Sequence, residues 1–259
     1  RQLPVWNDWL DRCRGWKDRY PLVLPEYLLK PEYVSTYLLV DTISTLLTSE
    51  DILVPCSSGT GADITMQSFR VKQGQKVLNS PGWGAMGFGI PHTIGACLAS
   101  ARRRTVCLNG DGGFQLNIQE LETIKRLGLP IKFFYLNNQG YASIKTTQRN
   151  YFQGRLVSSD ANSGLSLPDI RRVSEAYGIA HSRIKNQSEL EQKVQEALAN
   201  AGPFICEVMI DPAEEVMPKV KSYLGSNGKM ASKPLEDLAP FLERSEFLEN
   251  MLVAPVKEC

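Results

Sequence analysis

The stretch Gly110-Asp111-Gly112-Gly113-Phe114 decides the fold, together with Ile131-Lys132-Phe133-Phe134-Tyr135-Leu136-Asn137-Asn138 further along the chain. An apolar run at residues 105–108 precedes the first stretch, and residues 131–136 of the second stretch form another apolar run. Both runs are typical of buried strands. Between them, residues 120–127 carry apolar side chains at helical spacing. The pattern predicts strand, glycine-rich turn, helix and strand, with polar groups at the edge where open α/β sheets bind ligands.

The residue types in these motifs indicate an anion and metal site. Glycines at positions 110, 112 and 113 remove Cβ atoms, so backbone N–H groups can approach an anion closely. Asp111 adds a carboxylate and Asn138 an amide oxygen, which with phosphate and carbonyl oxygens form the ligand set that Mg²⁺ prefers. A solvated Asp in an ordinary turn is the alternative. A dinucleotide-binding turn is disfavoured, because Gly-x-Gly-x-x-Gly is not completed.

The two ends of this motif, separated by residues 113–136, resemble the cofactor fingerprint of thiamine-diphosphate (ThDP) enzymes. In that family the Asp, the second Asn and the backbone carbonyl two residues later bind the metal. The resemblance therefore implies Mg²⁺ ligands at Asp111, Asn138 and the carbonyl of Gly140. It also implies a cofactor-binding set drawn from several loops: Gly59, Thr60, Gly61, Gly84, Met86, Asp111, Gly112, Gly113, Asn138, Gly140, Tyr141, Ala142 and Ser143.

A second candidate diphosphate loop follows the first predicted strand, at residues 51–55. Residues 56–61 form a small, polar turn whose backbone N–H groups and hydroxyls could bind phosphate oxygens. By position this turn corresponds to the first diphosphate loop of the ThDP family. A plain connecting loop is the alternative interpretation.

A second glycine-rich stretch lies at residues 80–91. Glycines at this density cost conformational entropy unless the backbone must approach another group closely. The pattern Gly-x-Met-Gly-x-Gly-x-Pro at residues 84–91 resembles the acetohydroxyacid synthase branch of the family. The resemblance implies two catalytic roles: Met86 wedges the cofactor into a V shape, and the Gly84 carbonyl accepts a hydrogen bond from its amino group. For Met86, simple core packing is the alternative.

Two positions after Asn138 discriminate between branches of the family. Enzymes resembling pyruvate decarboxylase carry a proton-transferring Glu where this chain has Ile144, so an aliphatic residue there favours a carboligase. Acetohydroxyacid synthases carry a Trp where this chain has Thr147, and that Trp shapes the acceptor pocket. The usual acceptors, pyruvate and 2-ketobutyrate, are therefore not implied.

Bulk properties exclude several classes of protein. The 259 residues carry a net charge of +1, which gives no reason to propose nucleic acid or an anionic membrane as a partner. No apolar run reaches the length of a membrane span, and the first residues do not form a signal peptide. None of the 6 cysteines forms a Cys-x-x-Cys pair, which favours buried free thiols in a reducing compartment. We expect a cytoplasmic protein.

The order of predicted strands and helices indicates an α/β fold, a parallel sheet covered by helices on both faces. Residues 1–30 are expected to form a linker with one amphipathic helix, whose Trp6, Trp9 and Trp16 pack into a core. Residues 31–210 form the diphosphate-binding domain. Residues 211–259 are expected to form a C-terminal arm over the active site or a partner chain, with a short helix at 234–238; solvated disorder is the alternative.

The catalytic Glu of ThDP enzymes lies on a separate pyrimidine-binding domain, and no second domain of that kind fits into this chain. We therefore expect ThDP and Mg²⁺ binding without catalysis by this chain alone, as a truncated enzyme or a subunit of a split one. The complete protein is expected to be a carboligase acting on 2-oxo acids, acetolactate-synthase-like. The alternatives are a non-oxidative 2-oxo acid decarboxylase and a non-catalytic ThDP-binding subunit. The resemblance implies a homo-oligomer, dimer or tetramer, or pairing with a pyrimidine-binding subunit.

Overall fold

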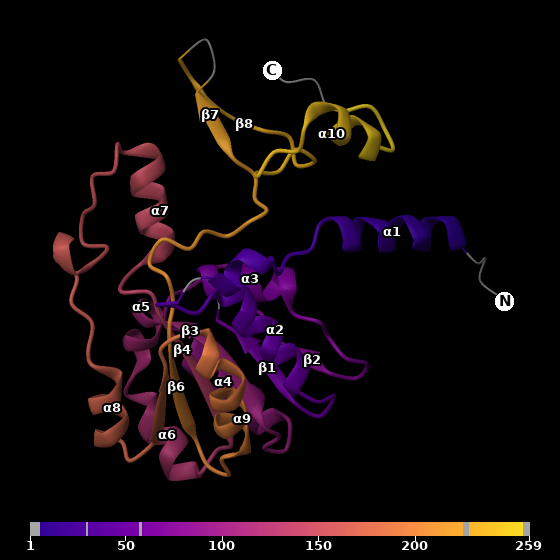
Figure 1. Cartoon of the computed structure of the whole chain (residues 1–259). Helices are drawn as coiled ribbons and strands as arrows, with labels where there is room; N and C mark the ends of the chain where they lie inside the picture. The colour runs from indigo at the N-terminus through magenta and orange to yellow at the C-terminus, as the bar shows by residue number, and fades with distance from the viewer. Residues whose placement is uncertain (1–5, 30, 57–58, 225–227, 256–259) are drawn as a thin grey trace. The chain divides into compact units, whose positions relative to one another are not determined.

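Six strands pair into one parallel sheet in the order β2-β1-β3-β4-β6-β5 (Figure 1). The computed structural model describes residues 6–29, 31–56, 59–224 and 228–255. The chain divides into two compact units, residues 1–214 with the sheet and residues 215–259. In chain order the strands are β1 Ile52–Pro55, β2 Lys76–Val77, β3 Thr105–Gly110, β4 Ile131–Asn137, β5 Ala180–Ile184 and β6 Phe204–Met209.

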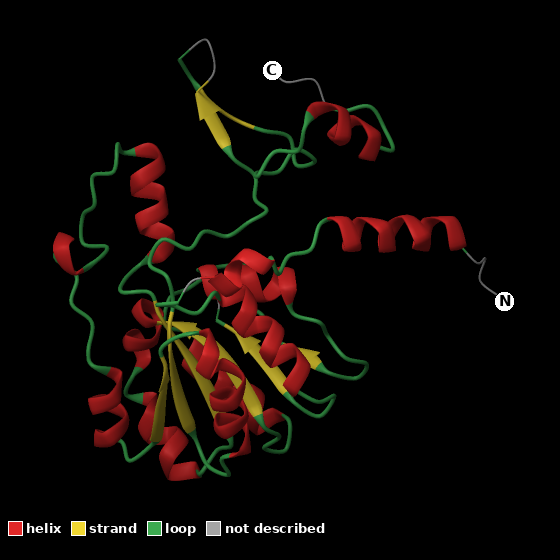
Figure 2. Cartoon of the chain, in the orientation of Figure 1, coloured by secondary structure: helices red, strands yellow, loops and turns green. Residues whose placement is uncertain are grey.

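Helices cover both faces of this sheet, which confirms the predicted α/β fold (Figure 2). On one face, α3 (Thr60–Ser68) and α9 (Leu190–Ala199) pack on the strands, and α2 (Thr36–Leu46) contacts both helices. On the other, α4 (Gly89–Ala99), α6 (Glu120–Leu127) and α8 (Ile170–Ala176) share a core with alternate residues of the strands. The central strands are almost wholly buried, as expected of a parallel sheet covered on both sides.

Local signals set the ends of two helices, of which only the end of α6 after residue 127 was predicted. Gly128 takes a left-handed conformation, φ 58°, and ends α6. The start of α2 is held by Ser35, whose hydroxyl accepts from the Tyr37 N–H. Glu214 adds a second cap, because its carboxylate accepts from the Thr36 N–H and the Ser35 hydroxyl.

Two local predictions are wrong. Residues 234–238 form a turn rather than a helix, and the helix of that region is α10 (Arg244–Asn250). The helix α1 (Asn7–Arg19) exists, but none of its residues is buried, so Trp6 and Trp9 do not pack into a core.

Several elements were not anticipated, among them α3, the hairpin of residues 222–232, one short strand of the sheet and one helix beside the site. The strand β2 has only two residues and carries Lys76, so it shows no apolar run. The helix α7 (Ala142–Tyr151) buries Lys145 alone, and therefore lacks the apolar stripe that marks most surface helices. Short helical turns complete the unit: η1 Pro25–Leu29, α5 Asp111–Phe114, η2 Gln115–Asn117, η3 Ala161–Ser163 and η4 Gln187–Glu189.

The second unit, residues 215–259, contains an antiparallel hairpin of β7 (Ser222–Leu224) and β8 (Met230–Ser232), followed by α10. Inside it, Arg244 pairs with both carboxylate oxygens of Asp237 at 2.9 Å. None of the helices in the described part of the chain is both long and apolar enough to span a membrane.

Candidate cofactor site

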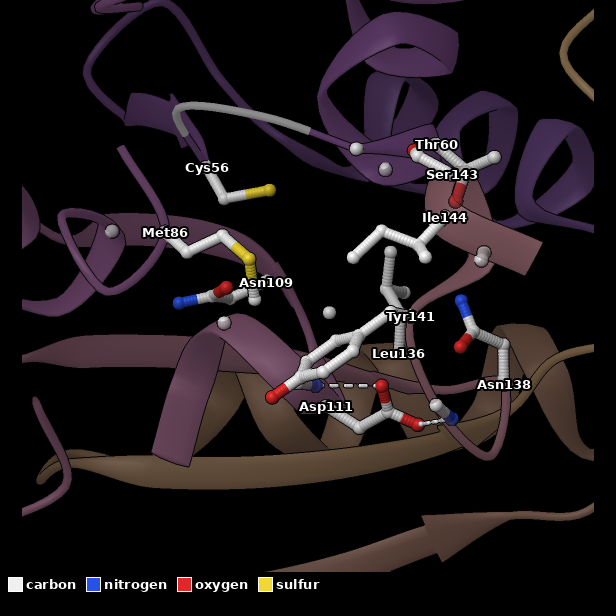
Figure 3. A pocket seen from close by; sticks show the side chains of 18 of the residues that line it. Cys56, Thr60, Met86, Asn109, Asp111, Leu136, Asn138, Tyr141, Ser143 and Ile144 are labelled. Carbon is white, nitrogen blue, oxygen red and sulfur yellow. Dashed lines mark hydrogen bonds between the residues drawn. The ribbon is translucent and has the colours of Figure 1, made fainter. Parts of the chain in front are cut away.

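A cavity of about 130 Å³ lies where β1, β3 and β4 end (Figure 3). After β1 the chain adds β2 on one side and then β3 on the other, so the direction of strand addition reverses here. Such a switch point leaves a crevice at the carboxyl ends of the strands, where ligands bind in this class of fold. The order of strands therefore places the predicted motifs around one crevice.

Asp111 lies at the floor of this crevice, 1% exposed. Its Oδ1 accepts from the Gly112 N–H at 2.6 Å and its Oδ2 from the Gly140 N–H at 3.1 Å. Burial raises the pKa of the carboxyl to about 6, although these hydrogen bonds and the Lys145 cation oppose the shift. A carboxylate has about four acceptor positions, so each oxygen keeps one for a further ligand.

Asn138 lies beside Asp111, and its buried Oδ1 has no hydrogen-bond partner among the residues that the structure describes. A buried amide oxygen with no donor costs about 1–3 kcal/mol, so a structure retains one where a ligand completes it. Asn138 also accepts, through its backbone carbonyl, from the buried Lys145 Nζ at 3.0 Å. The backbone carbonyl of Asn138 thus anchors the loop to Lys145, while the side chain lies at the cavity.

The loop that carries Asn138 has an uncommon backbone. Gln139 has φ 60° and Gly140 has φ 136°, two successive residues in the region that favours glycine. A Cβ on Gly140 would collide with the Ser159 carbonyl oxygen, and Ser159 also accepts from the Tyr141 N–H at 2.9 Å. Only glycine fits position 140, where the predicted metal-binding carbonyl lies.

Apolar side chains form the other side of the cavity. Met86, 40% exposed, comes from the loop before α4, and Ile144, 41% exposed, reaches in from α7 (Figure 3). Asn109, the penultimate residue of β3, lies near Met86 and is buried with its Nδ2 unpartnered. The cavity therefore has a polar side that suits a metal and phosphates, and an apolar side with a single amide donor.

The structure brings all but one of the predicted cofactor-binding residues to this cavity. Gly84 lies outside the lining residues, in the loop before Met86, with φ 57°. The lining also includes residues outside the predicted cofactor-binding set: Cys56, Gly87, Gly89, Asn109, Gly110, Leu136 and Ile144. Asn109 adjoins the Gly-Asp-Gly motif, and its place at a strand's end was the signal that could have marked it.

Acidic side chains supply only part of the oxygen ligands that a hard divalent cation needs at this cavity. Among residues 6–29, 31–56, 59–224 and 228–255, no three His, Cys, Asp or Glu side chains gather to hold a metal. Among the described residues that line the cavity, Asp111 has the one carboxylate, with the amide oxygen of Asn138 beside it. Such a site is completed by main-chain carbonyls and by oxygens of a bound phosphate, which is how Mg²⁺ is commonly held with nucleotides and diphosphates.

Comparison with known proteins identifies the fold and its ligand. Residues 58–208 match the model of the thiamine pyrophosphate enzyme C-terminal TPP binding domain. The chain belongs to this family. Thiamine pyrophosphate is ThDP, so the cavity of this TPP-binding domain lies where its cofactor is expected.

The relatives are acetolactate synthases. The chain is 31% identical to the acetolactate synthase large subunit of Cyanidium caldarium over 82% of this chain and 35% of that protein. It is 35% identical to the acetolactate synthase isozyme 2 large subunit of Escherichia coli over 61% of this chain and 28% of that protein. It is 36% identical to the acetolactate synthase large subunit of Haemophilus influenzae over 62% of this chain and 28% of that protein. The chain thus spans about a third of the length of these curated relatives.

Proposed function

We propose that this TPP-binding domain holds the diphosphate of ThDP through Mg²⁺ bound by Asp111, Asn138 and the Gly140 carbonyl. Together with a pyrimidine-binding domain that carries the catalytic Glu, it forms an acetolactate-synthase-like carboligase acting on 2-oxo acids. The observation that carries the metal assignment is the buried, unpartnered Oδ1 of Asn138 beside the Asp111 carboxylate. An oxygen that lacks a donor and adjoins a carboxylate suits a cation rather than an anion.

The glycine-rich walls support binding of the diphosphate. Residues 59–61 and 110–113 line the cavity from two strand ends. A Cβ on Gly112 would collide with the ring of Tyr141, so only glycine lets the two loops approach this closely. The backbone N–H groups of these loops can then face phosphate oxygens, while the metal offsets their charge.

The apolar side supports carboligation. When bound, ThDP supplies the electron sink that lets a 2-oxo acid lose carbon dioxide. Met86 would hold the cofactor in its bent shape, and the Gly84 carbonyl would accept a hydrogen bond from the cofactor's amino group. Ile144 has no proton to donate at this cavity. An acidic side chain in its place could transfer a proton, and release of an aldehyde would follow.

Thr147 leaves the choice of acceptor open and keeps the decarboxylase as a second candidate. Its side chain is exposed on α7, and its hydroxyl donates to the Ser143 carbonyl of the same helix at 3.0 Å. A small side chain at this position does not narrow an acceptor pocket as a Trp would. The substrate pair is therefore proposed only as a class.

The first test is calorimetric titration of the chain with ThDP, with and without Mg²⁺. We expect Mg²⁺-dependent binding that the Asp111→Ala variant loses, while a matched change at the exposed Asp169 leaves it intact. Retained affinity in Asp111→Ala would refute the metal assignment. For the complete protein fed pyruvate, acetolactate or acetoin supports the carboligase and acetaldehyde alone supports the decarboxylase. Binding without turnover, even with candidate partner subunits, would indicate a non-catalytic subunit.

A further inference from the structure

We propose that Glu207 is a positioning residue for the metal site: through Asn137 it fixes the backbone of residues 138–140, which carries Asn138 and the Gly140 carbonyl. The proposal rests on the proposed function, and it assigns a role to a buried carboxylate that does not line the cavity. Glu207 is 2% exposed in the middle of β6. An ionised group so deeply buried requires partners, and its partners lead to the site.

The two oxygens of Glu207 have different partners. Its Oε2 accepts from the Arg183 Nε at 2.6 Å, and the His181 Nε2 lies 3.5 Å away, both on the neighbouring strand β5. Its Oε1 accepts from the Asn137 Nδ2 at 2.7 Å, on the strand β4 at the other side. The carboxylate therefore bridges the edge strand to the last residue of the strand that carries the metal loop.

Asn137 passes this constraint to the loop. With its Nδ2 held by Glu207, its Oδ1 accepts from the Gln139 N–H at 3.3 Å. Gln139 is a non-glycine residue with φ 60°, a left-handed conformation that is less favourable than the usual ones. The amide of Asn137 thus supports the residue of the loop whose backbone is least favourable, directly between the two proposed ligands.

Two further hydrogen bonds hold other atoms of the loop. The Asp111 carboxylate receives the Gly140 N–H, and Lys145 donates to the Asn138 carbonyl. Each of these fixes one end of the turn, whereas the Glu207–Asn137 pair fixes its centre. Loss of this support should widen the distribution of loop conformations and weaken metal binding more than it weakens the fold. Substitution of residues that hydrogen-bond to metal ligands and orient them typically weakens metal affinity by about 10–100-fold.

A merely structural role for Glu207 is the competing explanation, and the chain contains a matched control. Asp51, also 2% exposed, pairs through both oxygens with Arg104 at 2.6 and 2.7 Å. This second buried ion pair lies at the opposite end of the sheet, where β1 and β3 begin. Its loss should affect stability without reaching the metal loop.

The experiment compares three variants of the chain with the unchanged chain: Glu207→Gln, Asn137→Ala and the control Asp51→Asn. Calorimetry with Mg²⁺ at saturating ThDP gives the metal Kd, and thermal unfolding without ligands gives stability. We expect the Kd to rise about 10-fold or more in Glu207→Gln and Asn137→Ala. Asp51→Asn should lower the Tm and leave the Kd within about two-fold, because distant sites act independently.

The two substitutions at the network should not be additive, so the double variant should bind Mg²⁺ no more weakly than the weaker single one. If Glu207→Gln does not fold, Asn137→Ala still decides, because Glu207 keeps Arg183 and His181 in that variant. An unchanged Kd in Asn137→Ala, or equal losses in all three variants, overturns the positioning role. Failure of the unchanged chain to bind Mg²⁺ and ThDP overturns the proposed function itself, so the two failures are distinguishable.

Discussion

Replacement of Asn138 by leucine should stabilise the chain when no cofactor is bound. The Oδ1 of Asn138 is buried without a partner, and leucine has nearly the same size and no polar atom. A buried oxygen that lacks a donor costs about 1–3 kcal/mol, and removal of that cost should raise the free energy of unfolding by a similar amount. For a unit of this size, each kcal/mol corresponds to about 2–4 °C in Tm.

Bound Mg²⁺ and ThDP should reverse the order of stability of the two proteins. At about 1,000 times the Kd, Mg²⁺ and ThDP add about 4.1 kcal/mol to the stability of the unchanged chain. Asn138→Leu lacks the proposed ligand oxygen and should gain almost nothing. Because 4.1 kcal/mol exceeds the largest expected benefit of the substitution, the unchanged chain should be the more stable one with cofactor and the less stable one without it.

The assay is thermal unfolding of both proteins, with and without Mg²⁺ and ThDP. Asn137→Leu is the control, since the amide of Asn137 is satisfied at both atoms, by Glu207 and by the Gln139 N–H. This control should lower the Tm without ligands. If Asn138→Leu also lowers the Tm without ligands, Asn138 has a structural partner and the assignment of its oxygen to a metal is refuted.

Three further outcomes follow from the same geometry. Gly140→Ala should lower the free energy of unfolding by at least about 1–3 kcal/mol, since the backbone has φ 136° and the added Cβ meets the Ser159 carbonyl; an unchanged denaturation midpoint contradicts this. Burial raises the pKa of Glu207, but the nearby His181 and hydrogen bonds from Arg183 and Asn137 outweigh it and hold the pKa at about 2. Stability from this group should be complete above the ordinary pKa of 4.5 and be lost as the pH falls towards 2, and Glu207→Gln should lack that component; parallel curves for the two proteins contradict this. In native thiol titration Cys13 should react before the four buried cysteines, and simultaneous reaction would show that the core opens readily.

The sequence predicts the central part of the fold well, because there each local signal agrees with the final burial. Residues 131–136 form one apolar run, and they become a strand covered on both faces. Glycine and proline mark where chains must turn, as at Gly128. The motif around Asp111 and Asn138 is predictable for the same reason, since the ends of neighbouring parallel strands necessarily meet at one edge.

The remaining features depend on tertiary contacts that local patterns do not carry. Lys145 and Glu207 are charged residues in the interior. Glu207 depends on Asn137, 70 residues away in the sequence, and Lys145 lies near the opposite charge of Asp111, which belongs to another strand end. Asn109 is an amide in a strand whose neighbouring glycines leave it room, which only the assembled cavity shows. The aromatic residues of α1 match the spacing of a core-facing helix, yet the helix buries none of them. Spacing indicates which residues share a face, and it does not say what covers that face.

The position of β6 has a consequence for the order in which the chain can assemble. The strand is the last of the sheet to be synthesised, yet it lies between β4 and β5 rather than at an edge. Until residues 204–209 leave the ribosome, β4 presents an open, apolar edge, and β5 has no strand to pair with. Open edges of this kind attach readily to other chains. A nascent chain whose residues 204–209 have not yet emerged should therefore aggregate or recruit chaperones, whereas one that has exposed them can close its sheet.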